Sequence, residues 1–235
     1  MQMVSEQPSR HGTEGAGAAD RAASERERAQ AYRWLSGIFA REISVEALMA
    51  YRAPGGIALL DGFGAHPSLA PLATTLRGFA LDHENPETVA KDLAGAFARL
   101  FLGVGGRRSA PPYESAYTSE RGLLFQEASG HSAAQLMNLG LQVSGSFSEP
   151  PDHLAVQLEI VAELARRREE SDGTADAEKY ADRQLAFLEN RLLPWIRAFR
   201  DDCATFDRSG FYATAAGCLV AYVTADAERL RAAQA

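Results

Sequence analysis

A rigid corner precedes the most apolar stretch of the chain. Residues 149–153 read Glu-Pro-Pro-Asp-His and lead directly into the apolar run 154–164. Each proline disfavours helical backbone in the residue before it, so the helix cannot begin before Pro151. Either Pro151 takes the first helical position or Asp152 serves as the N-cap. Because apolar residues cover nearly the whole circumference of this helix, it is expected inside the core.

The composition fits a globular domain that is preceded by a tail. The 235 residues are 46% hydrophobic and 23% charged, which is enough apolar material for a sizeable core. Residues 1–19 are rich in Gly, Ser, Glu and Ala and contain almost no bulky apolar side chain. We therefore predict a disordered tail over 1–19 and a single helical domain over 20–235.

Helical periodicity recurs along the whole domain, and no stretch alternates as a strand does. Asn85 and Ser209 are expected to cap helices, the Pro-Gly-Gly sequence at 54–56 to break one, and Pro194 to kink another. Besides the helix after residue 151, the expected helices cover 21–39, 45–51, 67–81, 86–101, 131–141, 177–199 and the stretch from 211 onward. These patterns predict an all-α fold, a single-domain helical bundle.

Charge and cysteine usage indicate a cytoplasmic protein. The formal net charge of −7 argues against binding to nucleic acid, which requires a basic surface. The N-terminus lacks the apolar run of a signal peptide, and no stretch is long enough to span a membrane, so an integral membrane protein is not expected. Cys203 and Cys218 read as small core residues in a reducing compartment.

Few residues suggest reaction chemistry. The 5 histidines include no pair at metal-ligand spacing, and we expect no metal site. The glycine-rich segment 103–109 lacks the Gly-Lys-Ser/Thr ending of a phosphate loop and follows a helix. Glu159 and Glu163 are spaced as a paired-carboxylate site would be, but they are better explained as a solvated stripe that faces Arg166 and Arg167. We therefore predict no catalytic residues and no cofactor.

Asp152 and His153 come closest to a reactive pair. An aspartate beside a histidine can orient the imidazole for acid–base work. The simpler interpretation is that Asp152 caps the helix while His153 fills its first turn. The pattern by itself favours this structural interpretation.

Several segments taken together resemble the TorD/DmsD family of molybdoenzyme-specific chaperones, also called redox enzyme maturation proteins. The resemblance spans roughly residues 30–230 and is most specific where a Pro-Pro-aromatic-x-Ser-x-Tyr loop is followed by a Glu-Pro-x-Asp-His-Leu corner. The matching segments are 97–103, 111–117, 122–125, 149–154, 185–199 and 211–226.

The resemblance implies an all-helical chaperone without catalytic activity. Members bind the twin-arginine leader and the apo form of a molybdopterin-dependent oxidoreductase of the DMSO reductase family. They assist cofactor insertion and withhold export until the enzyme is mature. The expected partners are therefore that leader peptide and apo catalytic subunit, together with the twin-arginine export machinery. The oligomeric state, monomer or homodimer, is left open.

The leader-binding surface of the family maps onto the proline-rich loop and the corner. Relatives often have Trp in place of Tyr113, Gly in place of Glu114 and an acid in place of Pro151. Acids would pair with the leader arginines, and aromatic side chains would cover its apolar run. The expected peptide-binding residues are Pro112, Tyr113, Glu114, Ser115, Tyr117, Phe125, Glu149, Pro150, Asp152 and His153.

Two other functions compete with this one. The first is an assembly chaperone of the nitrate-reductase type, whose cargo is a molybdoenzyme subunit that is not exported. The second is a small helical enzyme that uses Asp152, His153 and Glu159 on a small molecule.

Overall fold

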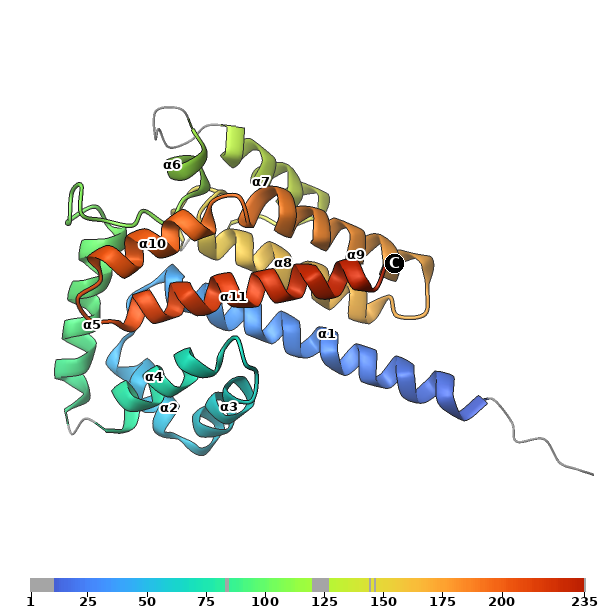
Figure 1. Cartoon of the computed structure of the whole chain (residues 1–235), viewed down its shortest axis with the longest axis horizontal. Helices are drawn as coiled ribbons and strands as arrows, with labels where there is room; N and C mark the ends of the chain where they lie inside the picture. Colours follow the sequence, from blue (N-terminus) through green and yellow to red (C-terminus); the bar gives the residue numbers. More distant parts are fainter. Residues whose placement is uncertain (1–10, 83–84, 120–126, 144, 146, 235) are drawn as a thin grey trace, which may run out of the picture.

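The computed structural model describes residues 11–82, 85–119, 127–143, 145 and 147–234. Within these ranges the chain is helical and contains no strand, which confirms the predicted all-α fold (Figure 1). The elements are α1 (His11–Ala40), α2 (Val45–Arg52), α3 (Pro54–Gly64), α4 (Ala70–Leu81), α5 (Pro86–Phe101), α6 (Glu114–Thr118), α7 (Glu127–Asn138), α8 (Leu154–Glu170), α9 (Ala175–Phe187), the π-helix η1 (Leu188–Leu192), α10 (Ile196–Phe206) and α11 (Phe211–Ala232).

The long helices pack side by side around α8. Helix α1 lies along α8, α8 packs against α9, and α10 packs against α11 (Figure 1). Helices α2, α3 and α4 form a smaller group that joins the bundle through α4 and α11, while α6 and α7 lie at the opposite side. No helix in the described part of the chain is long and apolar enough to cross a membrane.

Helix α8 is buried along most of its length, as its apolar circumference predicts. Leu154, Leu158, Ile160 and Leu164 are fully covered. Its start differs from both sequence expectations, because the N-cap is His153 rather than Asp152, and Pro151 lies in the preceding turn. The His153 ring provides the capping acceptor, and Asp152 is thereby left to other partners.

Two prolines affect the helices differently from the prediction. Pro54 occupies the first position of α3, a helix that the sequence reading took only as a break after α2. Pro194 does not kink a continuous helix; the segment 177–199 is instead divided into α9, η1 and α10. A π-helix precedes the proline, and Leu193 N–H donates to the Leu188 carbonyl. Such π segments are rare and are often found at functional sites.

Other predicted boundaries are confirmed or shifted slightly. Asn85 caps α5 through its side-chain oxygen, which accepts a hydrogen bond from Thr88 N–H at 3.0 Å. The N-cap of α11 is Gly210, in a left-handed conformation, although the Ser209 hydroxyl still accepts from Phe211 N–H. The first turns of α1 fall within the segment 1–19, and the predicted tail and domain boundary stay a prediction.

Candidate functional site

The proline-rich loop and the corner before α8 lie against each other. Tyr113 and His153 form an isolated antiparallel bridge. On either side of it, Leu154 N–H donates to the Pro112 carbonyl at 2.8 Å and Glu114 N–H donates to the Asp152 carbonyl at 3.1 Å. Two segments about forty positions apart thus share backbone hydrogen bonds, and most of the residues that the sequence reading grouped do form one cluster.

Asp152 is fully buried at the centre of this cluster. One carboxylate oxygen accepts from the Ser115 backbone N–H at 3.1 Å and from the Ser115 hydroxyl at 2.6 Å. The other accepts from the Ser129 hydroxyl of α7. The aspartate therefore joins the corner, α6 and α7, and its hydrogen-bonding capacity is taken up inside the protein.

His153 is also buried, with an exposed fraction of 4%. Its Nδ1 accepts from Ala155 N–H at 3.1 Å, which places the proton of the neutral ring on Nε2. The ring packs edge-on against Tyr113 at 5.1 Å and against Phe147 at 5.2 Å. Burial lowers the pKa of the imidazole to about 4, against the opposing effect of the Asp152 charge, so the ring is neutral at pH 7.

Glu114 is not a surface acid, since only 3% of it is exposed. It forms an ion pair with Arg191 of η1 and accepts a hydrogen bond from the Gln157 side chain of α8. Burial raises the pKa of this carboxyl, and the Arg191 charge counteracts part of that rise. Arg191 was not predicted, because Glu189 and Asn190 stand directly before it and the sequence does not show which of these polar side chains is buried.

Three of the partly exposed predicted contact residues form a surface that we call the accessible face. Tyr113, Glu149 and Pro150 are half-buried, and the Tyr113 hydroxyl donates to a Glu149 carboxylate oxygen at 2.7 Å. The pKa of Tyr113 is raised above its usual range, mainly by burial and to a smaller extent by this hydrogen bond. Glu149 is therefore the accessible acid among the predicted contacts.

Tyr117 links the loop to the aromatic core. Its ring stacks on Trp195 at 5.6 Å, and its hydroxyl donates to the Asp202 carboxylate at 3.0 Å. Burial and the neighbouring Asp202 charge raise the pKa of Tyr117. Phe125, which was predicted to contact the peptide, lies outside the described residues.

Some buried polar atoms near the site have no hydrogen-bond partner within the described part of the chain. They are Oε1 of Gln157, Nε of Arg191 and Nε1 of Trp195. Buried polar atoms are normally paired, so this region retains hydrogen-bonding capacity that the protein itself does not use.

The other carboxylate candidates are structural. Glu163 accepts from Arg166 and Arg167 on the next turn, and the hydrogen bond from Arg166 lowers the pKa of Glu163 to about 2 despite its partial burial. Glu159 is exposed near Arg33. The predicted pairing of Glu163 with Arg166 and Arg167 is therefore confirmed, but the Glu163 side chain is only 12% exposed and is not solvated as predicted. Among the described residues, no group of three or more His, Cys, Asp or Glu side chains could hold a metal ion.

Comparison with known families identifies the class. Residues 64–201 match the family model described as nitrate reductase delta subunit. This match includes the loop, the corner, α8 and η1. The segment that carries the site thus lies within the part of the chain that matches this family.

The relatives define the family more closely. The proteins named Chaperone protein TorD from Vibrio parahaemolyticus and Vibrio cholerae are 32% and 33% identical to this chain over 203 residues. The alignments cover 86% and 85% of this chain and 94% and 90% of those proteins, respectively. The protein of the same name from Photobacterium profundum is 31% identical over 201 residues.

The chain belongs to the TorD family of chaperones. Because its relatives are named chaperones, the prediction that it is not an enzyme is confirmed, and a role in molybdoenzyme maturation fits the family.

Proposed function

We propose that this chaperone binds the twin-arginine leader and the apo form of a molybdopterin-dependent oxidoreductase of the DMSO reductase family. It holds the cargo in the cytoplasm during cofactor insertion and withholds it from the export machinery until maturation is complete. The observation that carries the proposal is the junction of the 111–117 loop with the corner at 149–153, which presents Glu149 beside Tyr113 on an accessible face.

The chemistry of this face suits a leader peptide. A guanidinium pairs with a carboxylate through two parallel hydrogen bonds, and Glu149 is positioned for such a pair by the Tyr113 hydroxyl. The aromatic surface of Tyr113 and Phe147 beside it would cover apolar leader residues.

The buried members of the predicted set would act indirectly. Asp152, Ser115 and His153 hold the loop against the corner, while Glu114 anchors the loop to η1 through Arg191. A receptor surface fixed in this way loses little conformational entropy when a peptide binds. We therefore assign direct contact to Tyr113, Glu149, Pro150 and Tyr117, and positioning roles to the buried residues.

An assembly chaperone for a molybdoenzyme subunit that is not exported is the alternative. The description of the matched family, nitrate reductase delta subunit, favours this candidate. The relatives named TorD favour the leader-binding candidate.

One experiment separates these candidates. The full chain, carrying an affinity tag, is purified from its native host grown under conditions that induce molybdoenzymes, and co-purifying proteins are identified by mass spectrometry. We expect a molybdopterin oxidoreductase subunit whose precursor begins with a twin-arginine leader. A molybdoenzyme subunit without a leader would support the alternative. Purification without any molybdoenzyme subunit would contradict both.

A further inference from the structure

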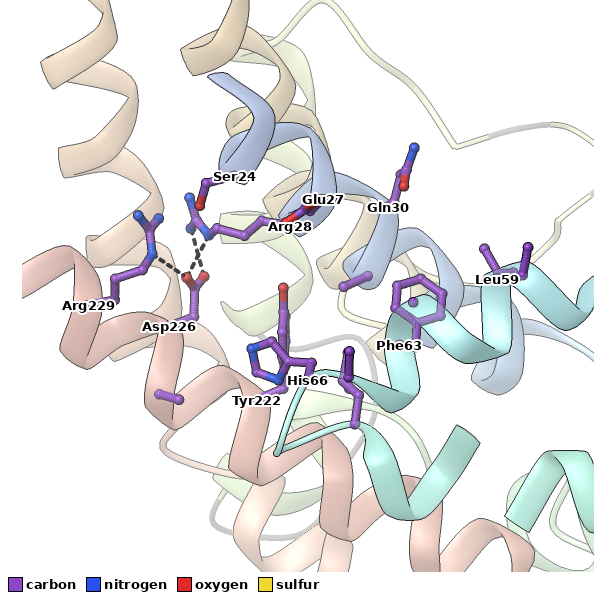
Figure 2. A pocket seen from close by; sticks show the side chains of 16 residues that line it. Ser24, Glu27, Arg28, Gln30, Leu59, Phe63, His66, Tyr222, Asp226 and Arg229 are labelled. Atoms are coloured by element: carbon purple, nitrogen blue, oxygen red, sulfur yellow. Dashed lines mark hydrogen bonds and ion pairs between the residues drawn. The ribbon is translucent and has the colours of Figure 1, made fainter. Parts of the chain in front are cut away.

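A second concave site lies away from the loop and the corner. Helices α1, α3 and α11 enclose a cavity of about 760 Å³, within the range of small-molecule sites in proteins (Figure 2). None of its lining residues belongs to the proposed peptide-binding face. The cavity has two chemically different ends, with Arg28, Asp226 and Arg229 at one and Phe63 and Leu59 at the other.

Tyr222 lies between the two ends with an unused hydroxyl group. The residue is 4% exposed, and its ring packs against Tyr32 at 5.2 Å and against His66 at 5.0 Å. No hydrogen bond to its hydroxyl occurs within the described residues, and Figure 2 shows this group pointing into the cavity. Its oxygen is not one of the fully covered polar atoms that lack a partner in the described part of the chain, so it faces the open space of the cavity and can donate to a ligand there.

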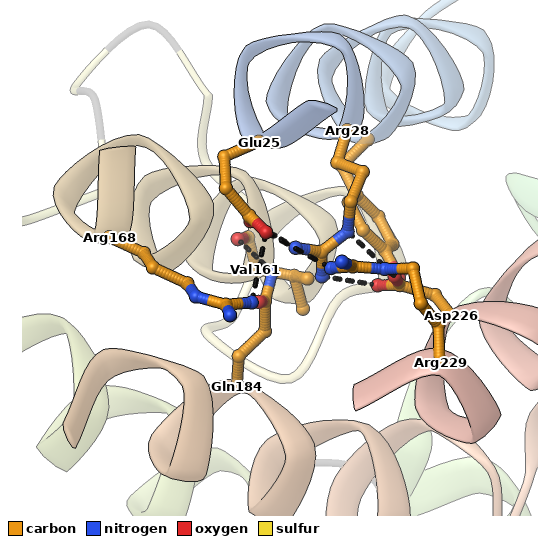
Figure 3. A network of polar contacts seen from close by, with 8 residues as sticks. Glu25, Arg28, Val161, Arg168, Gln184, Asp226 and Arg229 are labelled. Carbon is orange, nitrogen blue, oxygen red and sulfur yellow. Dashed lines mark hydrogen bonds and ion pairs between the residues drawn. The ribbon is translucent and has the colours of Figure 1, made fainter. Parts of the chain in front are cut away.

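The carboxylate of Asp226, at the polar end of the cavity, already accepts hydrogen bonds from neighbouring side chains. Asp226 accepts from Arg28 Nε at 2.6 Å and Nη2 at 2.7 Å, from the Tyr32 hydroxyl at 2.7 Å and from Arg229 Nε at 3.4 Å (Figure 3). Arg28 and Arg229 also bind Glu25 behind it. This carboxylate network is internally satisfied and offers little to a cationic ligand.

Donors remain available at the polar end, and the exposed Glu27 carboxylate at the rim is the acid that would oppose an anionic ligand there. Arg229 commits Nε and Nη2, which leaves the N–H groups of Nη1 on a side chain that is 39% exposed. Ser68 N–H donates to Nδ1 of His66, so the neutral ring carries a donor on Nε2. With the Tyr222 hydroxyl, these groups form a donor set suited to an acceptor that bears negative charge.

The apolar end would take the body of such a ligand. Phe63 is stacked on Trp34 at 4.3 Å and is thereby fixed, and Leu59, 39% exposed, forms the rim. Ala58 and Gly62 of α3 leave room above this floor, since a Cβ atom at Gly62 would meet nothing within 4 Å.

We propose that the cavity between α1, α3 and α11 binds a small organic carboxylate with an apolar body. Its carboxylate accepts from Arg229, Tyr222 and His66, and its body lies on Phe63 and Leu59. The site is independent of the peptide-binding face, and its occupancy does not depend on the cargo.

Calorimetry with the full chain tests this site, with naphthylacetate as the probe and naphthylethanol as its uncharged analogue. We expect naphthylacetate to bind with a dissociation constant of about 1 mM or below, the range for a compact ligand of this size, and naphthylethanol to bind about tenfold more weakly. Equal affinity for the two probes, or no binding of naphthylacetate, would overturn the proposal.

Substitutions of residues that line the cavity test whether naphthylacetate binds there. Tyr222→Phe and Arg229→Gln should each weaken naphthylacetate binding about tenfold, since each removes a donor to a charged group. Gly62→Leu fills the cavity and should abolish binding. Glu27→Gln removes an exposed rim acid and should tighten binding about twofold.

Matched controls lie outside the cavity. Arg231→Gln removes a charge from the same helix as Arg229, and Gly37→Leu adds the same side chain at another exposed helical glycine with open space around its Cβ position. Both should leave naphthylacetate affinity unchanged. The site assignment fails if Gly62→Leu, shown to be folded by circular dichroism, binds as tightly as Gly37→Leu.

Discussion

The hydroxyl of Ser115 donates to the carboxylate of Asp152 at 2.6 Å, across 37 positions of the chain. The same carboxylate oxygen accepts the Ser115 backbone N–H. Through this contact a short helix in the proline-rich loop is fastened to the turn that starts the central helix. The conformation of the accessible face therefore depends on a buried aspartate that a peptide cannot reach.

Asp152→Asn should lower the free energy of unfolding by about 2 kcal/mol, because the amide is a weaker acceptor and brings buried N–H groups among donors. Urea unfolding followed by circular dichroism measures the change. Glu149→Gln is the matched control on the accessible face and should change the free energy of unfolding by less than about 0.5 kcal/mol. Equal stability of the wild type and Asp152→Asn would remove the positioning role from this residue.

Arg191→Gln should destabilise the protein by about 3 kcal/mol at pH 7, because it leaves the buried Glu114 carboxylate without its counter-ion. Burial already raises the pKa of Glu114, so in the variant this carboxyl should protonate more readily as the pH falls. The stability difference between variant and wild type should therefore shrink from pH 7 to pH 5. A difference that is independent of pH would mean that Glu114 is not the group left unpaired.

His153 should make stability depend on pH below neutrality. Its pKa in the folded protein is about 4, below the ordinary value of 6.5. At pH values between these two, the unfolded chain therefore binds more protons than the folded protein does. Stability should consequently fall as the pH drops through this window, by about 2 kcal/mol between pH 7 and pH 4.5.

His153→Asn keeps a capping acceptor and has no titrating ring, so it isolates this contribution. Urea unfolding at both pH values should show a smaller loss for the variant than for the wild type. Parallel losses in the two proteins would show that the ring is not held neutral.

The local part of the fold was predictable from the sequence. Asn85 followed by proline sets the start of α5, and the apolar circumference of residues 154–164 indicates a buried helix. These features depend on neighbouring residues, whose preferences the sequence displays directly. Neither predicted start of α8, with Pro151 in the first position or with Asp152 as N-cap, was right. Asp152 is drawn away from the capping role because it accepts hydrogen bonds from Ser115 and Ser129, which the local sequence does not show.

The site was only partly predictable, for a similar reason. The segments that meet at Tyr113 and His153 were correctly grouped, since the family motif contains both. Which of its acids are accessible could not be read from the sequence. Glu114 is buried because Arg191 and Gln157 lie beside it, from elements far along the chain. The division of 177–199 by a π-helix depends on packing in the same way.

The proposed leader-binding role is tested most directly by calorimetry of the folded chain with a synthetic peptide. The peptide carries two adjacent arginines followed by an apolar run, and a second peptide has lysines in place of both arginines. We predict that the wild type binds the arginine peptide more tightly than the lysine peptide, because lysine lacks the paired donors of a guanidinium. Glu149→Gln should weaken binding of the arginine peptide about tenfold while its unfolding curve stays unchanged. Equal affinity of the wild type and Glu149→Gln for the arginine peptide would contradict the assignment of this face.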